Sequence, residues 1–371
     1  MVKFVHTSDW QIGMKGGGLG AAAGLVARER LRTIDRVLAV AEEQGADFVV
    51  ACGDLFEHNQ VSQELVEDIA RAIAGRRNVQ VHAIPGNHDL PGAGSVWNRS
   101  ALRAVSNLHV HLDPTPVLLG AVTIHPFPVR SRYAASDPLA ALPELRATPG
   151  VHIALAHGHL TTVTFGAHEE NIRLPLDPAH VDRTGLDFLA LGHWHGTRMF
   201  PAGDGATRIA YAGTHEQTSF RETDAGNVLL VEIAAKGAPP VVTPVRVGTL
   251  AWARIPFAFA ADVDLARLHA ALDACTADLL ELELSGEVPV SLYGEFRELV
   301  AAAEGRFKHL SAGDTDVRWR AAEVPETDPI ADAALAEVDR RLIAATAAGP
   351  DADVAREARA FFRRLVREAA P

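Results

Sequence analysis

The sequence predicts an α/β fold in which a largely parallel sheet packs against a second, mixed sheet. Two observations support this prediction. Over residues 1–130, short β-rich runs alternate with helical patterns, an order that is typical of parallel strands joined by right-handed crossovers. Over residues 122–233, strand-like runs continue with few helices between them, which indicates a further sheet. A small α/β unit and a helical tail are expected after residue 248.

The strands and helices of the first sheet follow from the spacing of apolar residues. Apolar residues three or four positions apart predict a helix, and short β-rich runs predict a strand. The expected strands cover residues 3–6, 47–52 and 79–84, and the helices between them carry apolar residues at Leu31, Ile34, Leu38 and Ala41 and at Leu65, Ile69 and Ile73. In such a β-α-β-α-β unit, the carboxyl ends of the strands converge on one crevice.

Five further strands are expected after this unit. They cover residues 122–127, 151–156, 187–191, 208–212 and 228–233. Because few helical patterns separate them, a second, mixed sheet packed on the first is expected. The run that follows, Lys236-Gly237-Ala238-Pro239-Pro240, predicts a turn-rich connection. We therefore expect three parts, residues 1–248, 249–322 and 323–371.

The two smaller parts differ in their patterns. Residues 249–322 are expected to form a small α/β cap, with a helix around residues 265–272 and a strand over residues 278–284. The tail is expected to form two helices separated by Gly349-Pro350, the second with Phe361 and Phe362 on one apolar stripe. Such a stripe packs on its own domain or docks on a partner.

The composition indicates a globular protein without a membrane segment. The chain has 371 residues, of which 48% are hydrophobic and 22% are charged, and its apolar runs are too short to cross a bilayer. No secretion signal is visible after Met1, so a cytoplasmic location is expected. The formal net charge of −12 argues against binding nucleic acid by bulk attraction alone, but metal ions or a local basic patch would still allow it.

Five short polar motifs occur in order, each just after a predicted strand. They are Ser8-Asp9-Trp10-Gln11, Gly53-Asp54-Leu55-Phe56, Gly86-Asn87-His88-Asp89, His157-Gly158-His159 and Gly192-His193-Trp194-His195. The ends of the strands converge, so these side chains can meet in space. Each motif alone is weak evidence, because Gly-Asp pairs are common in turns. The five together indicate one site.

The motifs offer carboxylate, amide and imidazole groups, a mixture that suits borderline divalent cations. Asp54 is the natural bridge, since one carboxylate can hold two cations about 3.5–4 Å apart. Such a pair polarises a phosphate oxygen and lowers the pKa of a bound water. His88 directly follows the ligand Asn87 and can face the phosphate, where it would donate a proton to the leaving oxygen. Gly53, Gly86 and Gly192 are expected to let the backbone turn sharply.

At these residues the sequence resembles the calcineurin-like metallophosphoesterase superfamily and, within it, the SbcD-type exonuclease subunit. Two stretches carry the narrower likeness. Gly53-Asp54-Leu55-Phe56-Glu57-His58-Asn59 resembles that group's second motif, and residues 211–222, followed by residues 228–233, resemble the signature after its last histidine pair. The likeness covers residues 1–233 well and the rest in outline. It implies a four-layered α/β/β/α sandwich, with a cap that helps to position DNA.

The resemblance also implies two metal ions, most often manganese, with iron, zinc or magnesium as alternatives. Asp54 would hold both ions. The remaining ligands would be divided between them, with Asp9 and His195 on one ion and Asn87, His157 and His193 on the other.

The catalytic residues implied by the likeness lie in the third motif. His88 would be the catalytic histidine, and Asp89 is expected beside it among the catalytic residues. His159 is interpreted as a spare or supporting residue, because the superfamily uses the first histidine of the His157-Gly158-His159 motif.

The chain departs from the superfamily pattern at two positions. Gln11 stands where a histidine is usual, and its amide oxygen is a weaker metal ligand than imidazole. Glu57 stands where the second motif often has histidine, and the adjacent His58 is the candidate to substitute for it. Arg130 and Arg132 are interpreted as part of a solvated loop, with DNA contact as the alternative.

These expectations define a metal-dependent DNA nuclease that uses an activated water and acts in DNA repair. One alternative is a phosphoesterase for a small phosphodiester or cyclic nucleotide, which the acidic net charge favours. The other is a non-catalytic metal-binding scaffold, which rests on Gln11 alone. The expected partners are DNA, an SbcC-type coiled-coil ATPase bound by the tail, and a second copy of the chain.

Overall fold

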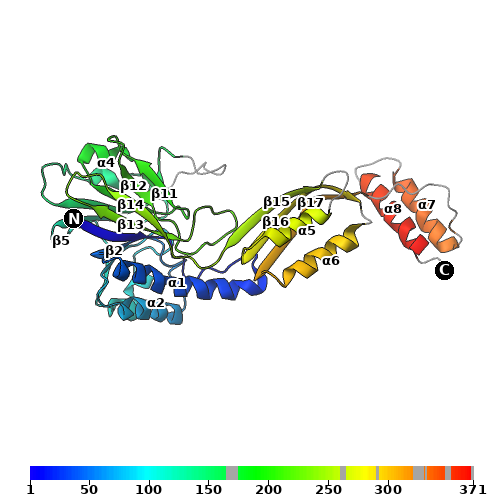
Figure 1. The fold of residues 1–371 in the computed structure, drawn as a ribbon, viewed down its shortest axis with the longest axis horizontal. Coiled ribbons are helices and arrows are strands. Elements are labelled where there is room, and N and C mark those ends of the chain that lie inside the picture. The colour runs from blue at the N-terminus through cyan, green and yellow to red at the C-terminus, as the bar shows by residue number, and fades with distance from the viewer. Residues whose placement is uncertain are drawn as a thin grey trace. The chain divides into compact units, whose positions relative to one another are not determined.

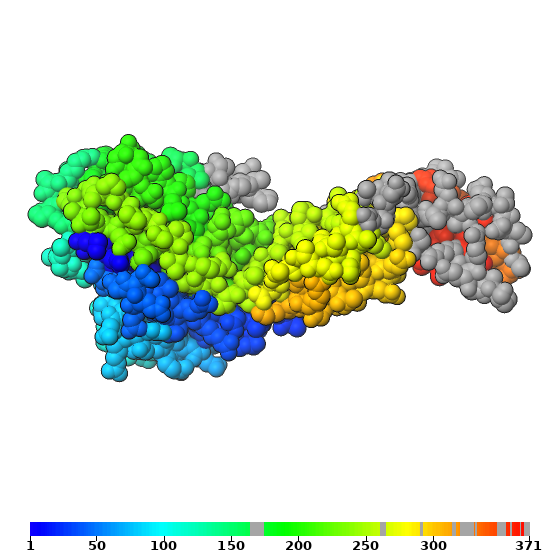
Figure 2. All heavy atoms as spheres, viewed as in Figure 1, coloured from blue at the N-terminus to red at the C-terminus, as the bar shows by residue number. Residues whose placement is uncertain are grey.

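The computed structural model describes residues 1–163, 174–259, 265–289, 292–320, 330, 332–346 and 352–368. The chain divides into two compact units, Met1–Leu250 and Ala251–Pro371. The first unit contains two six-stranded sheets, and the described part of the second contains a three-stranded sheet and four helices (Figure 1; all atoms in Figure 2). Within the described ranges, no helix combines the length and apolar character needed to span a bilayer.

The first sheet is parallel over four neighbouring strands and antiparallel at one edge. Its strands, in spatial order, are β14 (Val241–Arg246), β13 (Asn227–Ile233), β1 (Val2–Thr7), β2 (Phe48–Cys52), β3 (Val81–Ile84) and β4 (Leu108–Val110). The expectation that residues 228–233 belong to the second sheet is wrong, because β13 pairs antiparallel with β1. Sequence patterns give the strand but not its partner.

The second sheet is mixed, as predicted. Its strands, in spatial order, are β11 (Arg198–Pro201), β12 (Thr207–Tyr211), β10 (Phe188–Gly192), β7 (Val151–His157), β6 (Val122–Phe127) and β5 (Val117–Leu119). The four inner strands are parallel, and the two edge strands are antiparallel to their neighbours. A separate pair of short strands, β8 (His159–Leu160) and β9 (Pro175–Leu176), follows β7.

Helices cover the outer face of each sheet and complete the predicted α/β/β/α sandwich. On the first sheet, α1 (Ala23–Glu43) and α2 (Gln63–Gly75) bury residues such as Ile34 and Ile69 against Val49. The next residue along β2, Val50, faces the second sheet. This alternation lets one strand contribute to two cores. The second sheet is covered by α4 (Ala179–Thr184) and a 3₁₀ turn, η3 (Pro138–Ala141).

Three short helices lie in the loops of the first unit. They are η1 (Gly20–Ala22), η2 (Val96–Asn98) and α3 (Ser100–Arg103).

The second unit begins with a three-stranded parallel sheet. Its elements are β15 (Trp252–Phe259), α5 (Leu265–Ala274), β16 (Leu279–Pro289), α6 (Tyr293–Glu304) and β17 (His309–Arg320). The strand order β15-β16-β17 follows the chain, and both helices pack on the sheet through a core that includes Leu268 and Phe296. The predicted helix and strand of this part correspond to α5 and β16.

The chain ends in two helices, α7 (Ala333–Thr346) and α8 (Ala352–Glu368). Asp339 of α7 receives hydrogen bonds from Arg359 and Arg363 of α8, and these bonds tie the helices together. The expected boundary after residue 322 and the expected break at Gly349-Pro350 lie outside the described residues.

Candidate metal centre

The motif residues come together where strands of the two sheets end. Asp9, Asp54 and Asn87 follow β1, β2 and β3 of the first sheet, whereas His157 and His193 lie at the ends of β7 and β10 of the second. The backbone joins these segments directly: the N–H of Asp9 donates to the carbonyl of Gly53 over 3.0 Å. The centre therefore lies where the carboxyl ends of inner strands from both sheets meet.

The backbone at this edge is strained. Asp9, Gln11, Asp54 and His193 have φ values of 52°, 48°, 52° and 106°, in the left-handed region that residues with a side chain rarely adopt. In the described part of the chain, the only other such residues besides glycine are Leu174 and Asp224. Strain of this kind costs about 1–3 kcal/mol per residue and is characteristic of functional sites. Here it gathers at the residues expected to bind metal.

The glycines allow the motifs to approach one another closely. A Cβ atom on Gly86 would lie 2.1 Å from Oδ1 of Asp54, and one on Gly192 would lie 1.8 Å from the carbonyl oxygen of Cys52. Only Gly53 of the three motif glycines has a positive φ, of 83°. The expected sharp turn therefore applies to Gly53, whereas Gly86 and Gly192 are required because no side chain fits between the motifs.

Four candidate ligands converge on one position. Nε2 of His157 lies 3.3 Å from Oδ2 of Asp54 and 3.0 Å from Oδ1 of Asn87. The same Asn87 oxygen lies 3.2 Å from Nδ1 of His193. Ligands about 2.1 Å from one cation lie roughly 3 Å apart at right angles, so these separations fit a divalent ion. The structure thus brings together the whole set expected for the second ion.

The residues expected at the first ion adjoin this group. Asp9, Asp54 and His157 offer ligand atoms that all lie within 4.8 Å of one another. Nε2 of Gln11 lies 3.4 Å from Oδ2 of Asp54 and 3.5 Å from Nε2 of His195. Asp9, Gln11, His157 and His195 therefore lie around the Asp54 carboxylate.

Gln11 fits a cation ligand on a further ground. Its side chain is buried, and its Oε1 has no hydrogen-bond partner among the described residues. A buried amide oxygen without a partner carries a desolvation cost. Rotation of the amide by a half-turn would place Oε1 where Nε2 now contacts Asp54 and His195. A cation held there would satisfy the orphaned oxygen.

The electrostatics of the centre also favour a cation. Burial raises the pKa of Asp9, and the neighbouring His157 and His195 offset only part of this effect. Burial lowers the pKa of His157, but the carboxylates of Asp54 and Asp9 and the hydrogen bond to the Cys52 carbonyl together outweigh it and raise that pKa to about 9. The protonated imidazole thus supplies the positive charge that two buried carboxylates need. A divalent ion supplies it more effectively.

His195 is held in place by a residue that the motif analysis did not single out. Its Nδ1 lies 2.6 Å from Oε1 of Glu222 and 3.3 Å from Oγ1 of Thr218. A carboxylate on one ring nitrogen fixes the tautomer and directs the other nitrogen to a metal. Nε2 of His195 accordingly faces Gln11. The available signal was the signature stretch, which ends at Glu222, but no chemical role could be read from it.

His88 lies beside the Asp54 carboxylate, and part of its side chain is exposed. Its backbone N–H donates to Oδ1 of Asp54 over 2.9 Å, and its Nδ1 donates to the carbonyl of Glu57 over 2.9 Å. Nε2 lies 4.0 Å from Oδ2 of Asp54. The ring therefore presents Nε2 to the space beside the ligands, where an acid for the leaving oxygen is needed.

Three other predicted residues take different places. Asp89 is fully buried, and its carboxylate accepts backbone N–H groups from Leu55, Phe56 and Gly86, so it positions the motifs and does not face the reaction. His58 has no hydrogen bond from Nδ1 to any described residue. His159 begins β8, and its positive charge contributes to lowering the pKa of His193.

A buried arginine anchors the backbone of the first motif. Arg30 of α1 donates to the carbonyl of Trp10, between Asp9 and Gln11, and over 2.5 Å to the carbonyl of Glu216. The buried carboxylate of Glu216 in turn accepts the N–H groups of Thr249 and Leu250. These contacts fix the strained first loop to the end of the unit.

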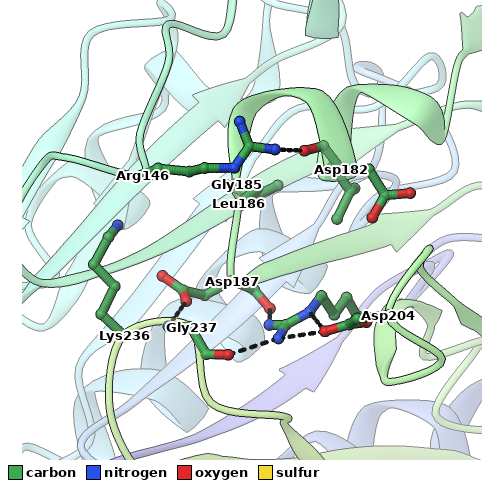
Figure 3. Close-up of a pocket in the computed structure, with 10 residues that line it drawn as sticks. Arg146, Asp182, Gly185, Leu186, Asp187, Asp204, Lys236 and Gly237 are labelled. Atoms are coloured by element: carbon green, nitrogen blue, oxygen red, sulfur yellow. Dashed lines mark hydrogen bonds and ion pairs between the residues drawn. The ribbon is translucent and has the colours of Figure 1, made fainter.

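A cavity of about 500 Å³ lies at the other end of β10 (Figure 3). It is lined by Arg146, Val181, Asp182, Gly185, Leu186, Asp187, Asp204, Arg208, Lys236 and Gly237. Arg208 donates to the Asp204 carboxylate and to the carbonyls of Asp187 and Gly237, while Asp187 accepts the N–H of Gly237. These bonds anchor the connection after β13, so we assign this cavity a structural role.

Residues 2–197 match the calcineurin-like phosphoesterase family. None of the curated proteins matches the chain. Similar solved structures include TT1561 of Thermus thermophilus, which is 15% identical over 66% of this chain and 99% of that chain, with a TM-score of 0.43.

Two further solved structures are similar to part of the chain. The purple acid phosphatase PPD1 of yellow lupin (Lupinus luteus) is 11% identical over 66% of this chain and 51% of that chain, with a TM-score of 0.38. The nuclease MPE of Pseudomonas putida is 13% identical over 63% of this chain and 85% of that chain, with a TM-score of 0.28. The family match spans more than half of the chain, which therefore belongs to the calcineurin-like phosphoesterases, a family of phosphoester hydrolases with a dinuclear divalent metal centre.

Proposed function

We propose that this protein is a DNA nuclease of the SbcD type that hydrolyses phosphodiester bonds with water as the nucleophile and acts in DNA repair. The hydrogen bond between Glu222 and His195 carries the proposal. Glu222 ends one of the two stretches that carry the likeness to the SbcD-type group. Because this residue orients a candidate ligand, the group-specific part of the sequence belongs to the reaction centre.

The chain's own residues divide the work of hydrolysis. When bound, the two cations polarise the phosphate oxygens and lower the pKa of water. Asp54 lies between the two ligand groups and fixes their separation. Nε2 of His88 lies beside Asp54 and donates a proton to the leaving oxygen as the phosphorus–oxygen bond breaks. The Glu57 carbonyl holds Nδ1 and thereby keeps Nε2 directed at the substrate.

Manganese is the metal that we propose for the centre. The ligands combine the carboxylates of Asp9 and Asp54, the amides of Gln11 and Asn87, and imidazoles. Oxygen ligands suit manganese better than they suit softer metal ions. The amide of Gln11 in place of an imidazole adds one more oxygen ligand and so favours manganese further. Elemental analysis of the purified protein, followed by reloading with manganese, iron, zinc or magnesium, tests the assignment through the activity that each metal restores.

We also propose that the helix pair α7–α8 docks on the coiled coil of an SbcC-type ATPase. Val354, Phe361 and Leu365 are 65%, 49% and 48% exposed and lie on one stripe of α8. Phe361→Glu combined with Leu365→Glu should abolish co-purification with such a coiled coil and leave nuclease activity intact. Retention of the coiled coil by this variant would contradict the docking.

The nuclease activity is tested by supplying duplex and single-stranded DNA with manganese. We expect cleavage of DNA, and its loss in His88→Ala excludes a contaminating nuclease. Turnover of bis(p-nitrophenyl) phosphate with intact DNA at low salt would contradict the proposal. That result would support the small-phosphodiester alternative, which the net charge of −12 favours.

A further inference from the structure

Arg132 reaches the metal centre from the segment that follows β6. Its Nε donates to the backbone carbonyl of Asn87 over 3.0 Å. The side-chain oxygen of the same Asn87 lies 3.0 Å from Nε2 of His157 and 3.2 Å from Nδ1 of His193. The guanidinium is therefore held against the backbone of Asn87, whose side chain belongs to the group of candidate metal ligands.

The rest of this guanidinium is available to a ligand. Arg132 is exposed. Its side chain makes one hydrogen bond to the described residues, the bond to Asn87. A guanidinium has five N–H donors in a planar fork that matches two oxygens of a phosphate. Because Nε is used by Asn87, the fork is oriented, and the terminal N–H groups remain to bind an anion.

The negative charge around the centre explains why a positively charged side chain is needed there. The groups beside Asn87 and His88 include the carboxylates of Asp54 and Glu57. Cations held by the candidate ligands would neutralise the phosphate that reacts. A second phosphate on the same strand would approach these carboxylates without a counter-charge, in a chain of net charge −12. Arg132 supplies positive charge at that position.

We propose that Arg132 binds the phosphate next to the scissile phosphate of a polynucleotide strand. This inference rests on the proposed function and specifies its substrate as a chain of phosphodiesters. Contacts to phosphate set the register of nucleic acid on a protein without reading its sequence. Arg132 thus places the scissile bond over the metal ligands.

The test compares a strand with a substrate that has a single phosphate. For Arg132→Gln we expect the ratio of kcat/KM on a single-stranded oligonucleotide to kcat/KM on bis(p-nitrophenyl) phosphate to fall at least tenfold, chiefly through KM. Arg130→Gln is the matched control, because Arg130 is also exposed and lies two residues earlier. It should leave the ratio unchanged. Arg132→Lys should recover part of the loss, since it keeps the charge but not the fork.

Salt dependence provides a second measurement. Strand binding is measured by fluorescence anisotropy in a His88→Ala background, so that the strand stays intact. The slope of log Kd against log salt should decrease by about 0.7 in Arg132→Gln, the value for one phosphate contact on a single strand. An equal loss on both substrates with an unchanged slope would show that Arg132 only supports Asn87 and would overturn the proposal.

The wild-type protein separates this inference from the function on which it rests. A wild type that cannot cleave the oligonucleotide overturns the nuclease proposal itself. A wild type that cleaves it, together with an Arg132→Gln variant that behaves like Arg130→Gln, overturns only the assignment of Arg132.

Discussion

Nδ1 of His88 lies 2.9 Å from the carbonyl oxygen of Glu57, which can only accept a hydrogen bond. Nδ1 therefore carries a proton, and Nε2 is left as the nitrogen that would exchange a proton with a substrate. The same carbonyl belongs to the segment that begins with Asp54, so one short stretch would supply the proposed bridging ligand and orient the proposed acid. This geometry supports the role that we propose for His88.

Replacement of His88 by alanine should lower kcat on phosphodiesters by about 10²–10⁴-fold, the usual contribution of a general acid or base. Metal content should not change, because His88 is not among the candidate ligands. His58→Ala is the matched control, since His58 is adjacent in sequence to the second motif. Steady-state rates and elemental analysis of both variants check this prediction. An equal loss of rate in His58→Ala would contradict the assignment.

Replacement of Gln11 by histidine should tighten the binding of the more weakly held cation. Imidazole is a stronger ligand than an amide, and Gln11 lies 3.5 Å from His195 and 3.4 Å from Asp54. Titration calorimetry with manganese measures the change. Gln11→Ala should weaken the same step. Identical affinities in all three proteins would refute Gln11 as a ligand.

Glu222→Gln should weaken metal binding by about 10–100-fold, as is typical when the support of a histidine ligand is lost. The carboxylate accepts from Nδ1 of His195 over 2.6 Å, and this bond and the charge of His195 hold the pKa of Glu222 below its usual value even though burial raises it. Glutamine keeps the shape but removes the charge. The affinity is read from metal titrations, with Glu232→Gln as the control, because Glu232 is a half-buried carboxylate on β13 that pairs with Lys3 and not with a candidate ligand. An effect no larger than that of the control would contradict the role of Glu222.

Asp339 should stabilise the α7–α8 pair in a pH-dependent manner. Hydrogen bonds from Arg363 and Arg359 outweigh partial burial and lower the pKa of Asp339 to about 2, compared with about 3.9 in an unfolded chain. A lowered pKa in the folded state stabilises above about pH 4, and this contribution is lost as the pH falls towards 2.

Asp339→Asn should remove this stabilisation at neutral pH. Hydrogen exchange of α7 and α8 measures it, and both helices should exchange faster in the variant. Glu337→Gln on the same helix breaks exposed ion pairs, which contribute little, and serves as the control. Equal protection in the two variants would show that Asp339 does not hold the helices together.

The strand-end motifs could be located from the sequence because each is a local pattern. A buried strand followed by glycine and a metal-binding side chain is visible without knowledge of the fold. Parallel strands then bring these ends together, which places Asp9, Asp54 and Asn87 side by side. The kinds of metal-binding group that the motifs offer could also be read from the sequence.

Other features depend on contacts between distant segments and could not be read locally. β13 pairs antiparallel with β1 although the two strands lie far apart in the sequence, so this pairing depends on the path of the whole chain between them. Glu222 follows no strand end, and its role appears only when it meets His195. The positioning role of Asp89 required its burial and its three backbone partners to be known. Long-range pairing and burial are properties of the folded chain.

The most direct test of the metal centre is a crystal structure of the protein grown with manganese, with the ions located by anomalous scattering. We predict two peaks about 3.5–4 Å apart on either side of Asp54. One should contact Asn87, His157 and His193, and the other should contact Asp9, Gln11 and His195. A single peak, or peaks that do not share Asp54, would contradict the central claim.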